Sequence, residues 1–119
     1  MTSLFDPVLL ARGPALPNRF MLSPLTNHQS NADGTLSDDE HKWLEMRATG
    51  GFGLVMTCAS HVQQVGQGFP GQLGCFGDQH LDGLKRIADT IRAAGKVSYV
   101  QLHHAGNRSP KELIGEAPV

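Results

Sequence analysis

Three short apolar runs, each followed by polar residues, glycine or proline, stand out along this chain of 119 residues. The first two, at 19–22 and 52–58, are apolar without strict alternation, which is typical of strands buried on both faces of a parallel sheet. Residues 96–103 form the third run and are interpreted as a further strand. Segments with helical spacing separate the runs. The pattern therefore predicts an α/β fold in the order β-α-β-α-β, with three adjacent parallel strands.

Both helices have recognisable ends. Ser37 and Glu40 match a capping box, in which each residue satisfies the other's free amide, so the first helix is expected to begin at Asp38. A pair of glycines should end it with a left-handed residue. The second helix should begin at Asp78 and stop at Gly95. The apolar residues expected to face the core are Trp43, Leu44, Met46 and Ala48 in the first helix and Leu81, Leu84, Ile87, Ala88, Ile91 and Ala94 in the second.

The other segments should be irregular. Residues 1–17 contain three prolines and are expected to form a lead-in with a small hairpin. Five glycines and one proline in residues 60–77 predict a long loop over the carboxyl ends of the strands. The three strands and two helices thus occupy residues 18–106, and residues 107–119 are expected to be an irregular polar loop.

Chemically useful residues gather where the three runs end. In parallel α/β sheets the carboxyl ends of the strands share one edge, which is where ligands bind. Thr26 offers a hydroxyl, and Pro24 frees nearby backbone groups from the ladder. The two donors and one acceptor of Gln101 match the edge of a pyrimidine-like ring, and Ala59 would let a flat ring approach the backbone. Purely structural alternatives are a proline-terminated strand with a capped turn and a small residue in a crowded core. The candidate site residues are Ser23, Pro24, Leu25, Thr26, Ala59 and Gln101.

Composition and charge narrow the class of ligand. With 10 basic and 11 acidic residues the net charge is -1, which argues against nucleic acid or a membrane surface and favours a small molecule. No apolar stretch approaches the ~20 residues that span a bilayer, so a cytoplasmic location is expected. The two cysteines are interpreted as packed thiols, because they are too few and too far apart for a disulfide framework. The histidines, expected mainly at the surface or in loops, lack metal-ligand spacing, so no metal site is expected.

Three strands and two helices would form an incomplete sheet. At least one strand edge is left unpaired, so we expect either a missing further portion or a homo-oligomer. An alternative is a non-catalytic α/β module that uses the open edge for self-assembly or partner binding. The two differ in a testable way, because part of a larger fold should self-associate whereas a true module should be monodisperse.

Three stretches of the chain resemble the N-terminal part of the old yellow enzyme family of NADH:flavin oxidoreductases. They are residues 17–26 (PNRFMLSPLT), residues 53–57 (GLVMT) leading to Ala59, and residues 101–106 (QLHHAG). The resemblance implies a TIM barrel that carries FMN, of which this chain holds an incomplete N-terminal portion. It also implies an ene-reductase, which passes hydride from NADH or NADPH through FMN to the activated C=C bond of a small substrate such as an enone.

The resemblance further implies roles for the candidate residues at the cofactor. The main chain of Pro24 and Leu25 would lie against the flavin, with Ser23 beside them as a further cofactor-binding residue. Thr26 would form a hydrogen bond near the C4 carbonyl of the flavin and tune its potential, which makes it the candidate catalytic residue. Ala59 would contact the ring system, and Gln101 would bind the pyrimidine end of the isoalloxazine.

The resemblance is weaker at two other positions. His28 falls where some relatives place a substrate-contacting aromatic residue, and is the candidate substrate residue. The family often has arginine directly after the His-Ala-Gly run, whereas here Asn107 precedes Arg108, so no phosphate role is assigned to Arg108. A barrel of eight units takes about 250 residues, so the substrate-anchoring pair and the proton donor are expected beyond this chain, which alone should be inactive.

Overall fold

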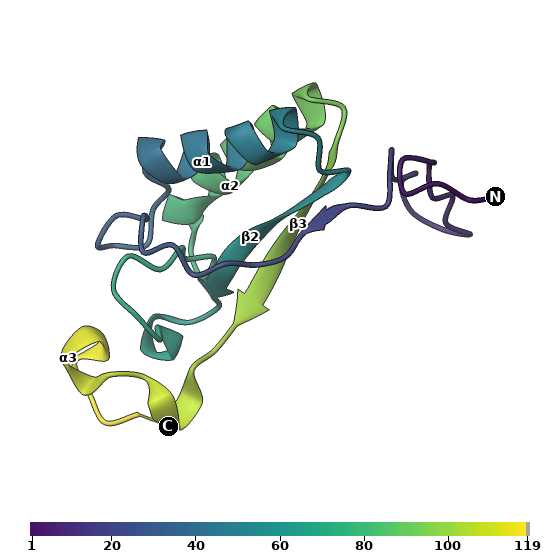
Figure 1. The fold of residues 1–119 in the computed structure, drawn as a ribbon. Coiled ribbons are helices and arrows are strands. Elements are labelled where there is room, and N and C mark those ends of the chain that lie inside the picture. Colours follow the sequence, from purple (N-terminus) through teal and green to yellow (C-terminus); the bar gives the residue numbers. More distant parts are fainter. Residues whose placement is uncertain (119) are drawn as a thin grey trace.

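The computed structural model describes residues 1–118 and confirms the parallel sheet. Its strands are β1 (Met21–Leu22), β2 (Leu54–His61) and β3 (Val97–His103), in the order β1-β2-β3. All neighbouring strands are parallel. The helices α1 (Asp38–Thr49) and α2 (Leu81–Ala93) pack together over one face of this sheet (Figure 1).

The hydrophobic core lies between the sheet and the two helices. Its buried members come from β1, β2, α1, α2 and the loop that follows β2; they are Leu22, Leu44, Ala48, Val55, Cys58, Leu73, Ile87 and Ile91. Of the residues expected to face the core, Met46, Leu81 and Ala88 lie outside it. Met46 is 56% exposed and Leu81 is 62% exposed, because α1 and α2 bury a narrower stripe than the apolar pattern indicates.

The N-terminus of α1 departs from the expected capping box. Ser37 Oγ accepts a hydrogen bond from the backbone N–H of Glu40 at 3.1 Å, which confirms the cap. The expected return bond from Glu40 is wrong, since its carboxylate is directed inward to side chains of the loop after β1 and of β2. At the other end, Gly51 has a φ of 118° and supplies the expected left-handed residue.

The strand β2 contains an extra residue relative to β3. Met56 pairs with Tyr99 and Ala59 pairs with Gln101, so three steps along β2 match two along β3. The backbone N–H of Gln101 donates to Thr57 Oγ1 at 3.3 Å within this bulge. Because of the bulge, Val55 and Cys58 both face the helical core, and Ala59, next in the strand, faces away from it.

Several segment boundaries also differ from expectation. β1 covers only Met21–Leu22 of the expected 19–22. The residues before it are held by the Asn18 side chain, which accepts a hydrogen bond from the Phe20 N–H and donates one to the Gly51 carbonyl. β2 continues to His61, and 3₁₀ turns at Gln64–Gly66 and Asp78–His80 shorten the expected loop and delay α2 to Leu81.

The two ends of the chain carry local structure. In the lead-in, Val8 and Leu16 form an isolated antiparallel bridge with two backbone hydrogen bonds of 2.9 Å. The expected irregular loop after residue 106 instead holds a 3₁₀ turn, Gly106–Arg108, and the short helix α3, Lys111–Ile114. Gly115 ends α3 in the left-handed conformation, with a φ of 77°. This glycine is a helix stop signal, but the polar composition around it indicated a loop.

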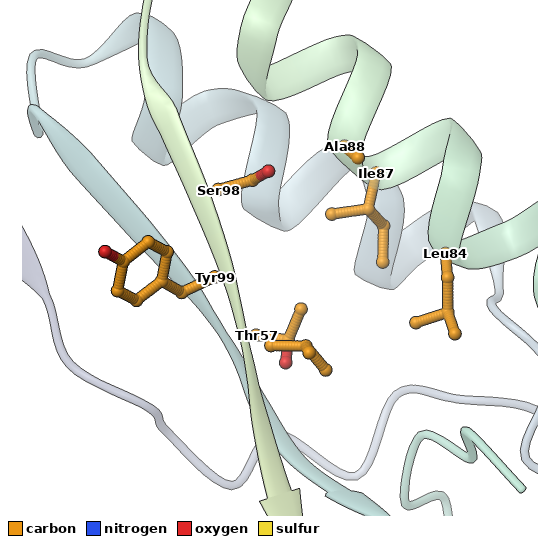
Figure 2. A pocket seen from close by; sticks show the side chains of 7 residues that line it. Thr57, Leu84, Ile87, Ala88, Ser98 and Tyr99 are labelled. Carbon is orange, nitrogen blue, oxygen red and sulfur yellow. The ribbon is translucent and has the colours of Figure 1, made fainter. Parts of the chain in front are cut away.

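An apolar cavity of about 200 Å³ opens between α2 and β3 (Figure 2). Leu84, Ile87 and Ala88 line it from the helix, and Ser98 is directed toward them from β3. The Tyr99 side chain lies on the other side of the strand. This cavity therefore belongs to the helix-covered face near the open edge of β3, and not to the carboxyl ends of the strands.

Candidate functional site

The segment that follows β1 lies at the carboxyl end of the sheet, as the sequence indicates. Ser23, Leu25 and Thr26 are exposed and Pro24 is half-buried. The hydroxyl of Thr26 and the backbone of this segment are therefore accessible to a ligand over that end of the strands.

Residues 27–30 come next and present His28; the Gln29 N–H donates to Asn27 Oδ1 at 3.2 Å, which makes this segment an Asx-type turn, called the 27–30 turn below. The φ of His28 is 54°, in the left-handed region that side chains other than glycine rarely adopt. His28 Nδ1 lies 2.9 Å from the carbonyl oxygen of Pro70, which can only accept, so Nδ1 carries the proton. The ring also meets Phe69 edge to face at 5.0 Å. A Cβ at Gly71 would lie 2.5 Å from the His28 carbonyl, so glycine permits this close approach.

Ala59 and Gln101 are brought together by strand register. As Cα partners on neighbouring strands, their side chains share the sheet face opposite the helices. Both are half-buried. Within residues 1–118 the side-chain amide of Gln101 has no hydrogen-bond partner, and only its backbone N–H is engaged. A flat heterocycle with donors and acceptors along one edge fits an amide that is free beside a small side chain.

Gln72 holds this arrangement together, and sequence reasoning missed its role. The side chain is fully buried. Its Nε2 donates to the Ala59 carbonyl at 2.8 Å and to His103 Nδ1 at 3.1 Å, and its Oε1 accepts the Gly68 N–H at 2.7 Å. Gln72 thus ties the loop after β2 to the ends of both β2 and β3.

His104 has a structural role at the end of β3. Its Nδ1 accepts the Gly106 N–H at 3.0 Å, and its Nε2 donates to Gln63 Oε1 at 3.1 Å. A Cβ at Gly66 would lie 2.4 Å from the His104 ring. The loop can therefore cover His104 only because residue 66 is a glycine. Both ring nitrogens are therefore committed to holding the loop.

Two histidines expected at the surface or in loops are buried. His61 and His80 are each 2% exposed, and Phe76 packs between them with ring centroids 5.0 and 4.6 Å away. Burial lowers the pKa of both, because the charged imidazolium loses its hydration. For His61, the hydrogen bond from Nδ1 to the Leu73 carbonyl raises the pKa and offsets part of this effect. For His80, the nearby carboxylate of Asp33 does the same. Both rings are thus held neutral.

The two cysteines are free, and Cys58 is fully buried. The Cys58 thiol donates to Glu40 Oε1 at 3.1 Å. Burial, and then the neighbouring carboxylate, raise the pKa of Cys58 to about 12. The thiol therefore stays protonated near neutral pH and is not a nucleophile. Among residues 1–118 there is no group of three or more His, Cys, Asp or Glu side chains placed to hold a metal ion.

The structure is a parallel β/α arrangement whose candidate site residues lie at the carboxyl ends of its strands. The sequence model of one family matches residues 3–118. The chain belongs to this family, the NADH:flavin oxidoreductase / NADH oxidase family.

Individual relatives agree with this assignment. The chain is 36% identical over 116 residues to the "Probable NADH-dependent flavin oxidoreductase YqiG" of Bacillus subtilis, covering 98% of this chain and 31% of that protein. It is 31% identical over 115 residues to NADH:acrylate oxidoreductase of Vibrio harveyi, covering 97% of this chain and 11% of that protein. Among solved structures, the old yellow enzyme homologue from Zymomonas mobilis superposes with a TM-score of 0.90 at 27% identity, over 98% of this chain and 32% of that one.

The chain spans about a third or less of the length of these relatives. Its three strands and two helices are accordingly part of a TIM barrel. None of the helices within residues 1–118 is long and apolar enough to cross a membrane.

Proposed function

We propose that this chain supplies part of the FMN site of an ene-reductase that takes hydride from NADH or NADPH and delivers it to the activated C=C bond of a small substrate such as an enone. Family membership supports the flavin and the nicotinamide donor. The relative named as an acrylate oxidoreductase supports the substrate class, because acrylate carries a C=C bond conjugated to a carboxylate. A cytoplasmic location, and residues 1–119 as one part of the FMN-binding barrel domain, belong to the same proposal.

The observation that carries this proposal is the free amide of Gln101 beside Ala59. A buried or half-buried amide is normally paired, whereas this one has no partner within residues 1–118. The pyrimidine end of an isoalloxazine presents carbonyl oxygens and a ring N–H, which one amide can bind at two points. Ala59, on the same sheet face, leaves room for the ring.

The flavin, when bound, supplies the hydride chemistry, and the residues of this chain bind, orient and tune it. We assign Gln101 to the pyrimidine end, the backbone of residues 23–25 to the ring, and the exposed hydroxyl of Thr26 to a hydrogen bond near the C4 carbonyl. Donation to that carbonyl favours added electron density on the ring, which is how Thr26 would affect the reaction. His28 is assigned to the substrate, because its ring is exposed and fixed in place.

A titration of FMN with the purified chain tests the proposal. Flavin fluorescence and the visible absorption bands should show saturable quenching and a spectral shift. In Gln101→Ala the loss of up to two hydrogen bonds should raise the FMN dissociation constant about tenfold. Gln64→Ala removes an exposed glutamine elsewhere on the same edge and should bind as the parent does. No saturable change with the parent chain, or equal binding by Gln101→Ala, would contradict the proposed site.

A second candidate function is a non-catalytic module that uses its open strand edge for self-assembly or partner binding. The observation in its favour is the exposed apolar surface of β3, where Val100 is 44% and Leu102 is 66% exposed. FMN binding by the chain would favour the flavoenzyme over this alternative.

A further inference from the structure

Glu40 is a fully buried carboxylate in the first turn of α1. Acidic residues in a first helical turn usually face solvent, as Asp38 and Asp39 do here. A buried charge is costly unless several donors surround it. The surroundings of Glu40 therefore bear directly on why a carboxylate occupies this position.

Three side chains donate to the Glu40 carboxylate. Oε1 accepts from Asn27 Nδ2 at 3.4 Å and from Cys58 Sγ at 3.1 Å, and Oε2 accepts from Ser30 Oγ. Two of the donors belong to the 27–30 turn and the third belongs to β2. The carboxylate thus joins the turn to the strand through the end of α1.

Two of these donors are direct neighbours of candidate site residues. Asn27 lies between Thr26 and His28, and Cys58 immediately precedes Ala59. The loop after β1 and the end of β2 are therefore held to one another by a group that itself lies on the helix side of the sheet.

The cap residue adds a further hold on the turn. Ser37 Oγ donates to the Gln29 carbonyl at 2.5 Å while it accepts the Glu40 N–H. The turn also carries the left-handed backbone of His28, a conformation that persists only where its surroundings impose it. The first turn of α1 supplies such a constraint from one side, and the Gly71 carbonyl, which accepts the Ser30 N–H at 3.1 Å, supplies it from the other.

We propose that Glu40 is a positioning residue of the flavin site: through Asn27, Ser30 and Cys58 its buried carboxylate fixes the 27–30 turn against β2, and so sets Thr26 and His28 relative to Ala59. This inference rests on the proposed function, because it gives Glu40 a role toward the same FMN site. If Glu40 served folding alone, FMN binding would depend only on whether the chain is folded. The proposed role requires instead that FMN binding depend on the hydrogen bonds of the Glu40 side chain.

Three variants of the 119-residue chain separate these roles. Glu40→Ala removes the acceptor but keeps a good helix former. Glu40→Gln keeps it, since the amide oxygen can still accept from Asn27 and Cys58 and the amide N–H can donate to Ser30 Oγ. Glu45→Ala, an exposed glutamate on the same helix, is the matched control.

Two measurements are made on each variant. Hydrogen exchange of the Gln29 and Ser30 amides, which are bonded within and beside the turn, reports whether the turn is held. The FMN dissociation constant and the flavin absorption bands report on the site. In Glu40→Ala we expect exchange faster by at least about tenfold and a dissociation constant raised by about tenfold, with Glu40→Gln restoring most of both and Glu45→Ala unchanged.

Several results would overturn the inference. Protection of the turn that persists in Glu40→Ala, FMN binding that is unchanged when protection is lost, or a Glu40→Gln chain as impaired as Glu40→Ala would each do so. If Glu40→Ala loses its helical circular dichroism, Asn27→Ala carries the test, since it keeps Glu40 and should still weaken FMN binding about threefold. Failure of the proposed function is distinguishable, because it appears in the parent chain as an absence of FMN binding.

Discussion

Among residues 1–118, His28 is the one non-glycine residue with a positive φ, at 54°. Its ring is fixed by the Pro70 carbonyl and by Phe69, and its backbone by the contacts of the 27–30 turn. Strained backbone of this kind tends to occur at binding sites, where the surrounding structure holds one residue in a chosen direction. This is consistent with the proposed role of His28 toward the substrate.

The strain at His28 can be measured by comparing two substitutions. Glycine and alanine both remove the imidazole, but only glycine adopts a positive φ without steric cost. We therefore expect His28→Gly to be more stable than His28→Ala by about 1 kcal/mol in urea unfolding. Equal stabilities, or a more stable alanine variant, would show that the left-handed conformation is not maintained in solution.

The buried thiol of Cys58 offers a second measurement on a single residue. With its pKa raised to about 12, Cys58 should react very slowly with iodoacetamide at pH 8, where the half-buried Cys75 reacts first. Burial also raises the pKa of Cys75, but this thiol is the less buried of the two. Mass spectrometry of the native chain should show one modification per molecule, and a second only after unfolding. Rapid double modification would mean that the Cys58 environment is open.

At the scale of elements, the N-terminus of α1 connects the helix to the site. Ser37 Oγ caps the helix and also binds the Gln29 carbonyl, so one hydroxyl serves both the helix and the turn. The loop after β2 makes the matching contact from the other side, with Gly71 against His28 and Gln72 bound to Ala59. The site is thus shaped by two loops that are fixed to the ends of a helix and of two strands.

Removal of the Ser37 hydroxyl tests this double role. Ser37→Ala should lower the free energy of unfolding by about 1–2 kcal/mol, at the upper end of the range for cap removal because a second bond is lost. Ser98→Ala is the control, since the Ser98 hydroxyl forms no hydrogen bond within the described part of the chain. Chemical denaturation of both variants gives the comparison, and similar small losses would contradict the double role.

Two buried histidines make stability depend on pH. His61 and His80 have a pKa below the usual 6.5 in the folded chain, so the unfolded chain binds more protons as pH falls through that value. Their neutral burial therefore contributes stability that is complete above pH 6.5 and is lost as pH falls from there toward the lowered pKa. The urea midpoint should be lower at pH 5 than at pH 7.5.

The variant His80→Gln removes one of the two titrating rings and should therefore reduce this pH dependence. The pKa of Asp33 is also lowered in the folded chain, but its effect on stability changes with pH only below about the ordinary value of 3.8. Asp33 therefore does not account for a change in stability between pH 7.5 and pH 5. A midpoint that stays constant from pH 7.5 to pH 5 would contradict neutral burial of both rings.

Elements with local signals could be predicted from the sequence. The start of α1 at Asp38 follows from the Ser37 cap, and the sheet order follows from the right-handed connections between parallel strands. The candidate residues after β1 could likewise be placed, because Pro24 marks the end of that strand. In these cases the residues that determine the structure lie within a few positions of the feature.

Features that depend on distant partners could not be predicted. Glu40 leaves the capping box for donors in the preceding loop and in β2, which are 10 to 18 residues away. Gln72 is one of four glutamines in its loop, and its bond to His103 spans 31 residues. The bulge in β2 has no local signature either, since it is defined only by the register with β3. Tertiary contacts decide all three.

At the scale of the whole molecule, β1 and β3 are the two edge strands of the sheet within residues 1–118, and β3 is the longer of them. Tyr99 is 43%, Val100 44% and Leu102 66% exposed, and the apolar cavity beside α2 opens next to them. The related proteins are at least about three times as long, and in a barrel each strand has neighbours on both sides. The exposed edge of β3 is therefore where further barrel structure, or a second copy of the chain, would pair.

The isolated chain should consequently self-associate in a concentration-dependent way, through the edge of β3. Burial of one exposed leucine is worth about 1.5–3 kcal/mol, and a lysine on an edge strand opposes pairing. Leu102→Lys should therefore raise the dissociation constant for self-association by at least about tenfold in sedimentation velocity. Leu9→Lys changes a leucine that is 81% exposed in the N-terminal hairpin and should associate like the parent. If the parent chain is monodisperse across the concentration range, the edge of β3 does not drive self-association and this prediction is wrong. If Leu9→Lys is the variant that blocks association, the contact lies in the hairpin and not along β3.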